Sequence, residues 1–152
     1  MAHEAAVEGV GVGVAEEGSG APVVILEARE EFVPIFVSSD QAQSIQLALA
    51  GEPFERPLTH DLLLEMIAEF GAAIDRVRLD DLADGTYYAK IDAEQYENGE
   101  ATPAVFDARP SDAIAIALRV DCPIVLSDAV IDEAGRPPEV FDDPDDFDDE
   151  RL

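Results

Sequence analysis

The chain has 152 residues, 47% of them hydrophobic, and its 35 acidic residues against nine basic ones give a formal charge of −26. These values fit one folded domain with a real core and exclude a chain that is disordered throughout. They also argue against generic nucleic-acid binding, which draws on clustered lysine and arginine.

The acidity has two interpretations. At molar salt a Debye length of about 3 Å screens the self-repulsion of so many carboxylates, so we expect a halophilic protein, and the alternative is acidity directed at a cationic partner. The single cysteine, Cys122, excludes an internal disulfide and a cysteine-rich zinc site. The sequence shows no signal-peptide pattern and no apolar stretch of about 18 residues, so we expect a cytoplasmic protein without membrane association.

Apolar runs and alternation predict seven strands, and helical spacing predicts four helices. The strands are expected at residues 7–15, 23–28, 32–37, 73–82, 86–93, 104–108 and 123–126. Turns are expected at 84–85 and across 95–103. The predicted N-terminal caps of the helices are Ser38, Thr59, Ser111 and either Ser127 or Asp128. The second helix is expected to bury an apolar face made by Leu62, Leu63, Met66, Ile67 and Phe70.

The predicted fold is α+β, a single compact domain over 7–136 with a mixed, mostly antiparallel sheet and about four helices. Residues 1–6 are expected to be frayed, and the acidic residues 137–152 to form a disordered tail. The two halves read alike, because each has three strands before its helical part. An internal duplication is one interpretation, and the general similarity of strand–cap–helix units is the other.

The densest polar group in the ordered part of the chain is Asp107, Arg109 and Asp112, at a strand-to-helix corner. Pro110 stops the strand, so two carboxylates and a guanidinium are expected to converge where the helix begins. The carboxylates could hold Mg²⁺ or Mn²⁺ while Arg109 meets a phosphate, with Ser111 as a substrate-binding residue. The alternative is structural: Arg109 pairs with a neighbouring carboxylate, and Asp112 serves the helix dipole.

A second candidate precedes the second predicted helix, where Arg56, Thr59, His60 and Asp61 lie close together. With Thr59 as the N-cap, His60 and Asp61 fall in the first turn, whose free N–H groups can bind an anion. His60 could transfer a proton beside Asp61, with Arg56 and Thr59 as substrate-binding residues. The alternative is a surface histidine next to a capping carboxylate. The acidic hairpin at 80–84 could also bind a metal, although turns favour aspartate for backbone reasons.

Several devices common in nucleases are missing from the sequence. Lys90 is the only lysine, and Tyr88 rather than an acidic residue stands two positions before it. There is no histidine-rich cluster, and no Gly-rich loop is followed by Lys-Ser or Lys-Thr.

Five segments in this order nevertheless resemble the bifunctional nuclease (BFN) domain family, which began as a domain of unknown function. They read VPIFV at 33–37, AL-x-G at 48–51, RP-x-THDL at 56–62, DL-x-DGT-x-YA at 81–89 and DARPSDAI at 107–114. The resemblance covers roughly residues 5–136, nearly the whole predicted domain. The acidic surface and tail look like a haloarchaeal version of the family.

The resemblance implies a compact α+β fold, often dimeric, and nuclease activity on DNA and RNA. Residue chemistry and motif position make His60, Asp61, Asp107 and Arg109 the candidate catalytic residues, with Asp107 and Asp112 as metal ligands. We therefore expect a homodimer that hydrolyses phosphodiester bonds of nucleic acid with the help of Mg²⁺ or Mn²⁺. The alternative is a non-catalytic dimeric module that regulates, or that binds a small anionic ligand.

Overall fold

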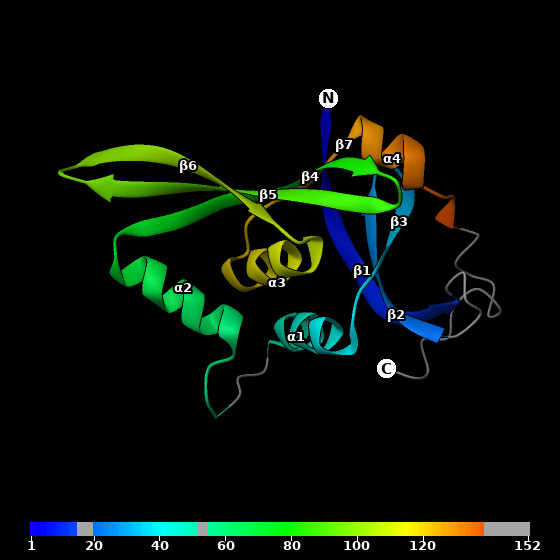
Figure 1. Ribbon diagram of the computed structural model, residues 1–152, viewed down its shortest axis with the longest axis horizontal. Coiled ribbons are helices and arrows are strands. Elements are labelled where there is room, and N and C mark those ends of the chain that lie inside the picture. The colour runs from blue at the N-terminus through cyan, green and yellow to red at the C-terminus, as the bar shows by residue number, and fades with distance from the viewer. Residues whose placement is uncertain (15–19, 52–54, 139–152) are drawn as a thin grey trace.

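The chain forms one seven-stranded sheet with four helices, as a computed structural model describes for residues 1–14, 20–51 and 55–138 (Figure 1). The strands are β1 (Ala2–Val14), β2 (Gly20–Ala28), β3 (Glu31–Phe36), β4 (Ala72–Ala83), β5 (Thr86–Glu97), β6 (Glu100–Ala108) and β7 (Ile124–Ser127). The helices are α1 (Ser39–Ala50), α2 (Thr59–Glu69), α3 (Pro110–Val120) and α4 (Asp128–Ala134). The predicted α+β class is confirmed.

The order of strands in the sheet is β3-β2-β1-β7-β4-β5-β6. Two antiparallel meanders, β1–β3 and β4–β6, therefore stand on either side of β7. Strand β7 pairs antiparallel with β1 and parallel with β4, which makes the sheet mixed and mostly antiparallel, as predicted. Each meander leads into a helix, α1 or α3, in the order expected for an internal duplication. The duplication itself stays a prediction.

Helix α3 is central to the core because small side chains let it pack closely against its neighbours. Ala113, Ile114 and Ala117 are almost completely buried in the same cluster as Leu79 and Leu126. In Figure 1, α1, α2 and α3 lie together below β4–β6, whereas α4 lies beside β3 and β7. This packing fixes the start of α3 at the end of β6. No helix in the described part of the chain has the length and apolar run needed to cross a bilayer.

Strands β5 and β6 are longer than predicted. The expected turn across 95–103 is wrong, because β5 continues to Glu97 and β6 begins at Glu100. Asn98 and Gly99 alone turn the chain, both with positive φ (54° and 80°), as in two-residue hairpin loops whose twist suits the flanking strands. The polar residues near this turn do not end the strands, because they occupy exposed positions of the hairpin.

The predicted fraying of residues 1–6 is also wrong, because residues 2–5 pair antiparallel with β7. His3 Nε2 lies 2.6 Å from Asp128 Oδ1, and Arg29 Nη1 donates to the same oxygen at 3.0 Å. The hydrogen bond with His3 is the main cause that lowers the pKa of the Asp128 carboxyl. A terminus tied in this way does not fray. Most of the predicted tail, 137–152, lies outside the described residues.

Helix α2 does not bury the apolar face that its sequence predicts. Leu62, Leu63, Met66 and Phe70, on and just after the helix, have exposed fractions between 42% and 74%. We call these four residues the α2 stripe. The helix instead turns the side with His60 and Asp61 toward α1 and α3. Helical spacing identifies an apolar stripe, but it does not show whether the same chain covers it.

Candidate functional site at the start of helix α3

The strand-to-helix corner forms as predicted, but its cap differs. Arg109 is the N-cap of α3 and Pro110 takes the first helical position, so the prediction of Ser111 as N-cap is wrong. Proline suits that position because the N–H group it lacks would have no helical partner there. The cap makes no side-chain hydrogen bond, which leaves the backbone N–H groups of Ser111 and Asp112 without partners inside the helix. Such a helix start attracts anions.

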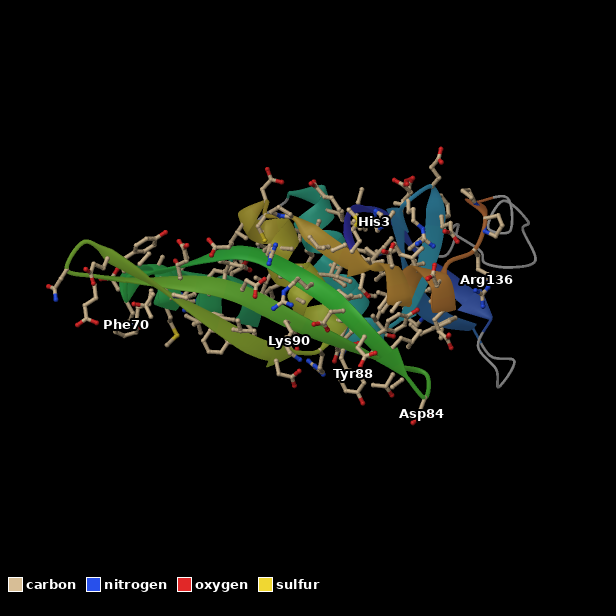
Figure 2. The ribbon with its side chains drawn as sticks, turned by 90° about the horizontal axis from the view of Figure 1, so that it is seen from above. His3, Phe70, Asp84, Tyr88, Lys90 and Arg136 are labelled. Atoms are coloured by element: carbon tan, nitrogen blue, oxygen red, sulfur yellow. The ribbon has the colours of Figure 1, made fainter. Side chains whose placement is uncertain are left out.

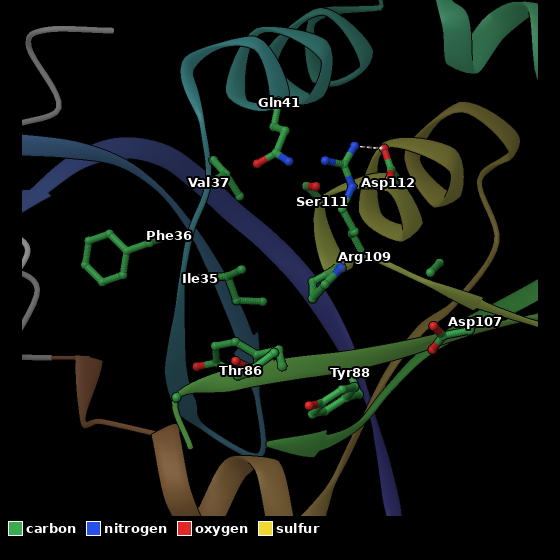
Figure 3. A pocket seen from close by; sticks show the side chains of 14 residues that line it. Ile35, Phe36, Val37, Gln41, Thr86, Tyr88, Asp107, Arg109, Ser111 and Asp112 are labelled. Atoms are coloured by element: carbon green, nitrogen blue, oxygen red, sulfur yellow. Dashed lines mark hydrogen bonds and ion pairs between the residues drawn. The ribbon is translucent and has the colours of Figure 1, made fainter. Parts of the chain in front are cut away.

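This helix start opens on a cleft of about 680 Å³ formed by α1, α3 and strands β3, β5 and β6 (Figure 3). Tyr88 and Asp107 lie on one side of it, Ser111 and Asp112 lie on the other, and the Arg109 side chain extends toward Asp112. Ser111 is nearly buried, and its hydroxyl makes no hydrogen bond with another described residue. The cleft therefore brings together four of the predicted site residues, Asp107, Arg109, Ser111 and Asp112.

Asp112 is the centre of the polar network in this corner. Its Oδ1 lies 2.9 Å from Nε2 of His60 and 3.2 Å from Nη2 of Arg109, and its Oδ2 accepts a 2.8 Å hydrogen bond from Nε of Arg109. Desolvation would raise the pKa of this carboxyl, but the hydrogen bonds from Arg109 and His60 outweigh it and lower the pKa. Asp112 is thus ionised at neutral pH with both oxygens occupied.

The two predicted helix starts meet directly through His60. Its Nε2 faces Asp112, and its Nδ1 lies 2.9 Å from the hydroxyl oxygen of Ser44 on α1. Serine, histidine and aspartate in this order resemble a nucleophilic triad. However, Ser44 is only 8% exposed and does not line the cleft, so its hydroxyl orients the imidazole ring. Ser44 was not predicted as a site residue. The only indication of its role in the sequence is that a polar residue lies beside the apolar side chains of α1.

Asp61 and Arg56 line a different cleft, of about 800 Å³, between α1, α2 and α3. Asp61 Oδ1 accepts a 2.7 Å hydrogen bond from Arg119 Nε, and Oδ2 accepts one of 3.0 Å from the backbone N–H of Leu58. These bonds outweigh desolvation and lower the pKa of Asp61. The prediction of Thr59 as N-cap is wrong, because Leu58 is the N-cap and Thr59 is the first helical residue. The structure therefore places Arg56 and Asp61 away from the cleft where α3 begins.

Arg119 ties the three helices together, and sequence reasoning missed it. Its side chain is 9% exposed, and besides Asp61 it donates to the backbone carbonyls of Ala115 at 2.9 Å and Ser44 at 3.2 Å. In the sequence it is an arginine in the last turn of an apolar helix, a position that also suits the helix dipole. Only the packing of α1 and α2 on α3 shows its role.

The donor set does not suit a resident metal ion. In residues 1–14, 20–51 and 55–138, no group of three or more His, Cys, Asp or Glu side chains could hold one. Asp112 already binds His60 and Arg109, and Asp107 Oδ1 lies 3.3 Å from Lys90 Nζ. A cation held by Asp112 would have to compete with His60 and Arg109 for its oxygens. Metal assistance thus stays a prediction.

Comparison with known proteins points to one family. A family model described as the bifunctional nuclease domain matches residues 23–139. An uncharacterized protein of Mycobacterium tuberculosis is 39% identical over 134 residues, which cover 83% of this chain and 73% of that protein. Bifunctional nuclease 2 of Oryza sativa subsp. japonica is 30% identical over 112 residues, covering 71% and 34%. Bifunctional nuclease 1 of the same plant is 29% identical over 101 residues, covering 66% and 30%. The matches span about a third of each rice protein.

Proposed function

Because this chain belongs to the bifunctional nuclease domain family, we propose that it hydrolyses phosphodiester bonds of DNA or RNA in the cleft where α3 begins. One observation carries the proposal: a mostly exposed arginine, Arg109, stands at an uncapped helix N-terminus on the wall of that cleft. A guanidinium and free backbone N–H groups are the partners that a phosphate requires. The names of the rice relatives support the class of reaction, at about 30% identity.

Arg109 is the residue that would hold the phosphate. Its Nε and Nη2 donate to Asp112, which fixes the guanidinium and leaves Nη1 for a phosphoryl oxygen. The free N–H groups of Ser111 and Asp112 lie in the same helix turn and add a second set of donors. These groups would stabilise the charge that develops on the phosphoryl oxygens in the transition state.

Asp107 is the proposed base that takes a proton from the attacking water. It is the more exposed of the two carboxylates in the cleft, at 78%, and its contact with Lys90 is long at 3.3 Å. His60 does not line the cleft, and both of its ring nitrogens are engaged, so it acts through Asp112 as a positioning residue. The leaving oxygen would be protonated from solvent.

The proposal is tested by cleavage assays in molar KCl, the condition expected to suit so acidic a chain. Labelled single- and double-stranded DNA and RNA are incubated with Mg²⁺, with Mn²⁺ or with a chelator. We expect Asp107→Asn to lower cleavage at least about 100-fold, as loss of a general base does. Asp121→Asn is the matched control, because Asp121 ends the same helix with φ 57°, which asparagine tolerates.

Two outcomes of this assay decide between the alternatives. Equal traces of cleavage in wild type, Asp107→Asn and Asp121→Asn would indicate a contaminating nuclease. The chain would then be better described as a non-catalytic module that holds a small anion at the same corner. Cleavage that chelation abolishes would show that a divalent cation takes part although Asp112 is already engaged.

We also infer that a second copy of the chain covers the α2 stripe. Neighbouring exposed apolar side chains mark interaction surfaces, and the four side chains of the stripe carry no charge in a chain of net charge −26. Leu62→Glu combined with Met66→Glu is expected to turn a dimer into a monomer, measured by size exclusion with light scattering in molar KCl. Glu65→Gln is the control on the same helix. A wild-type protein that stays monomeric at high concentration would contradict this inference.

A further inference from the structure

Tyr88 occupies a position that the proposed reaction does not use. It is 43% exposed and lines both the cleft where α3 begins and a neighbouring cleft of about 370 Å³, whose other lining residues are Lys90, Asp80 and Asp81. Figure 2 shows Tyr88 and Lys90 following one another along β5, and Figure 3 shows Tyr88 on the side of the cleft that faces α3. The two clefts therefore adjoin at this aromatic ring.

The side chain of Tyr88 is available to contact a ligand, whereas the hydroxyl groups of the other two tyrosines are engaged in hydrogen bonds. The hydroxyl of Tyr87 donates to the carbonyl of Pro34 at 3.0 Å, and burial raises the pKa of Tyr87 to about 12. The hydroxyl of Tyr96 donates to Glu94 Oε2 at 2.6 Å. The hydroxyl of Tyr88, by contrast, makes no hydrogen bond with another described residue. An exposed ring of this kind, at the edge of a polar cleft, offers a large flat contact surface.

The net charge of the chain restricts the ligand chemistry that can use this ring. The nearest cations, Lys90 and Arg109, are each paired with an aspartate, and salt weakens their attraction for phosphates further. Stacking of a nucleobase on an aromatic ring does not depend on net charge, and every base has a face that can stack. Only unpaired bases can leave their neighbours to stack on a protein. The site therefore favours a single strand over a duplex.

We propose that Tyr88 is a base-stacking platform for single-stranded nucleic acid, placed so that the phosphate beside the stacked base reaches Arg109. The inference rests on the proposed function, because it names the substrate class for the same cleft. Lys90 lies two positions further along β5, on the same face of the strand, and meets the next phosphate. Stacking supplies the affinity, and the start of α3 selects the phosphate that is cleaved.

Binding measured without cleavage tests this inference separately from the reaction. A fluorescein-labelled hexathymidylate, an abasic strand of the same length and a hairpin duplex are titrated with protein in molar KCl and chelator, and anisotropy gives the Kd. The strands are checked for integrity after each titration. We expect wild-type protein to bind hexathymidylate more tightly than either the abasic strand or the duplex.

The variants isolate the aromatic ring. Tyr88→Ala is expected to weaken hexathymidylate binding roughly 5- to 150-fold, toward the affinity of wild type for the abasic strand. Tyr88→Phe keeps the ring and should bind as wild type does. Tyr96→Ala is the matched control, because Tyr96 is an exposed tyrosine further along the same strand. Thermal melts of each variant confirm that the fold is intact.

Three results would overturn the stacking platform: equal affinity of wild type and Tyr88→Ala, equal affinity of wild type for the hexathymidylate and the abasic strand, or no detectable binding. Binding that depends on Tyr88 without cleavage under any metal condition would have a different meaning. It would support the platform and contradict the nuclease.

Discussion

Arg109→Gln is expected to lower the rate of nucleic-acid cleavage roughly 100- to 1000-fold, the loss that follows removal of one donor to a developing negative charge. Arg109 is the one positively charged side chain among the described residues that line the cleft at α3. Glutamine keeps hydrogen-bond donors but not the charge, so the change reports on the guanidinium. Initial rates with a single-stranded substrate in molar KCl measure it.

Arg136→Gln provides the matched control for this variant. Arg136 is an arginine outside the cleft, and its Nη1 donates to the carbonyl of neighbouring Gly135. Arg109→Lys should recover only part of the rate, because an ammonium group keeps the charge but not the paired geometry that holds Asp112. If the Arg109→Gln variant cleaved at the wild-type rate, this result would contradict a reaction centred on the start of α3.

The largest expected loss of stability comes from Arg119→Met, at about 2 kcal/mol in the free energy of unfolding, because Arg119 is nearly buried while Asp61 is 41% exposed. Arg119 is 9% exposed and joins α3 to Asp61 on α2 and to the carbonyl of Ser44 on α1. Methionine fills a similar length but leaves the Asp61 carboxylate and the carbonyl without this donor. Urea unfolding in molar KCl, followed by circular dichroism, measures the change.

Two further variants separate this pair from an ordinary surface ion pair. Arg76→Met removes an arginine that is 54% exposed and paired with Asp92, and should cost about 1 kcal/mol or less. Adding Asp61→Asn to Arg119→Met should recover part of the loss, because it removes the unpaired charge and keeps an acceptor for the N–H of Leu58. Equal unfolding midpoints for wild type and Arg119→Met would contradict the role given to Arg119.

Much of the scaffold could be predicted from the sequence, because it depends on local rules. Periodicity located α3 and the strands of both meanders, and the capping box from Ser38 to Gln41 is present at the start of α1. The place of His60 and of Asp112 in the first turn of a helix was also predictable, although their contact was not. These features need only near neighbours in the chain.

The partner that each polar group takes could not be predicted in this way. Ser44 lies 16 residues from His60, and Arg119 lies 58 residues from Asp61, so only the packing of three helices brings them together. The same packing turns the α2 stripe outward, although its spacing is that of a buried face. At the corner itself, Pro110 at the first helical position moves the cap from Ser111 to Arg109.

The most direct test of phosphate binding where α3 begins is the change in backbone amide chemical shifts during a titration. Phosphorothioate-linked hexathymidylate, which resists cleavage, is added to ¹⁵N-labelled protein in molar KCl. We predict that the amides of Ser111, Asp112 and Ala113 shift together and saturate with a single Kd. Shifts of amides near Arg56 in the second cleft, or shifts that do not saturate, would contradict phosphate binding at the start of α3.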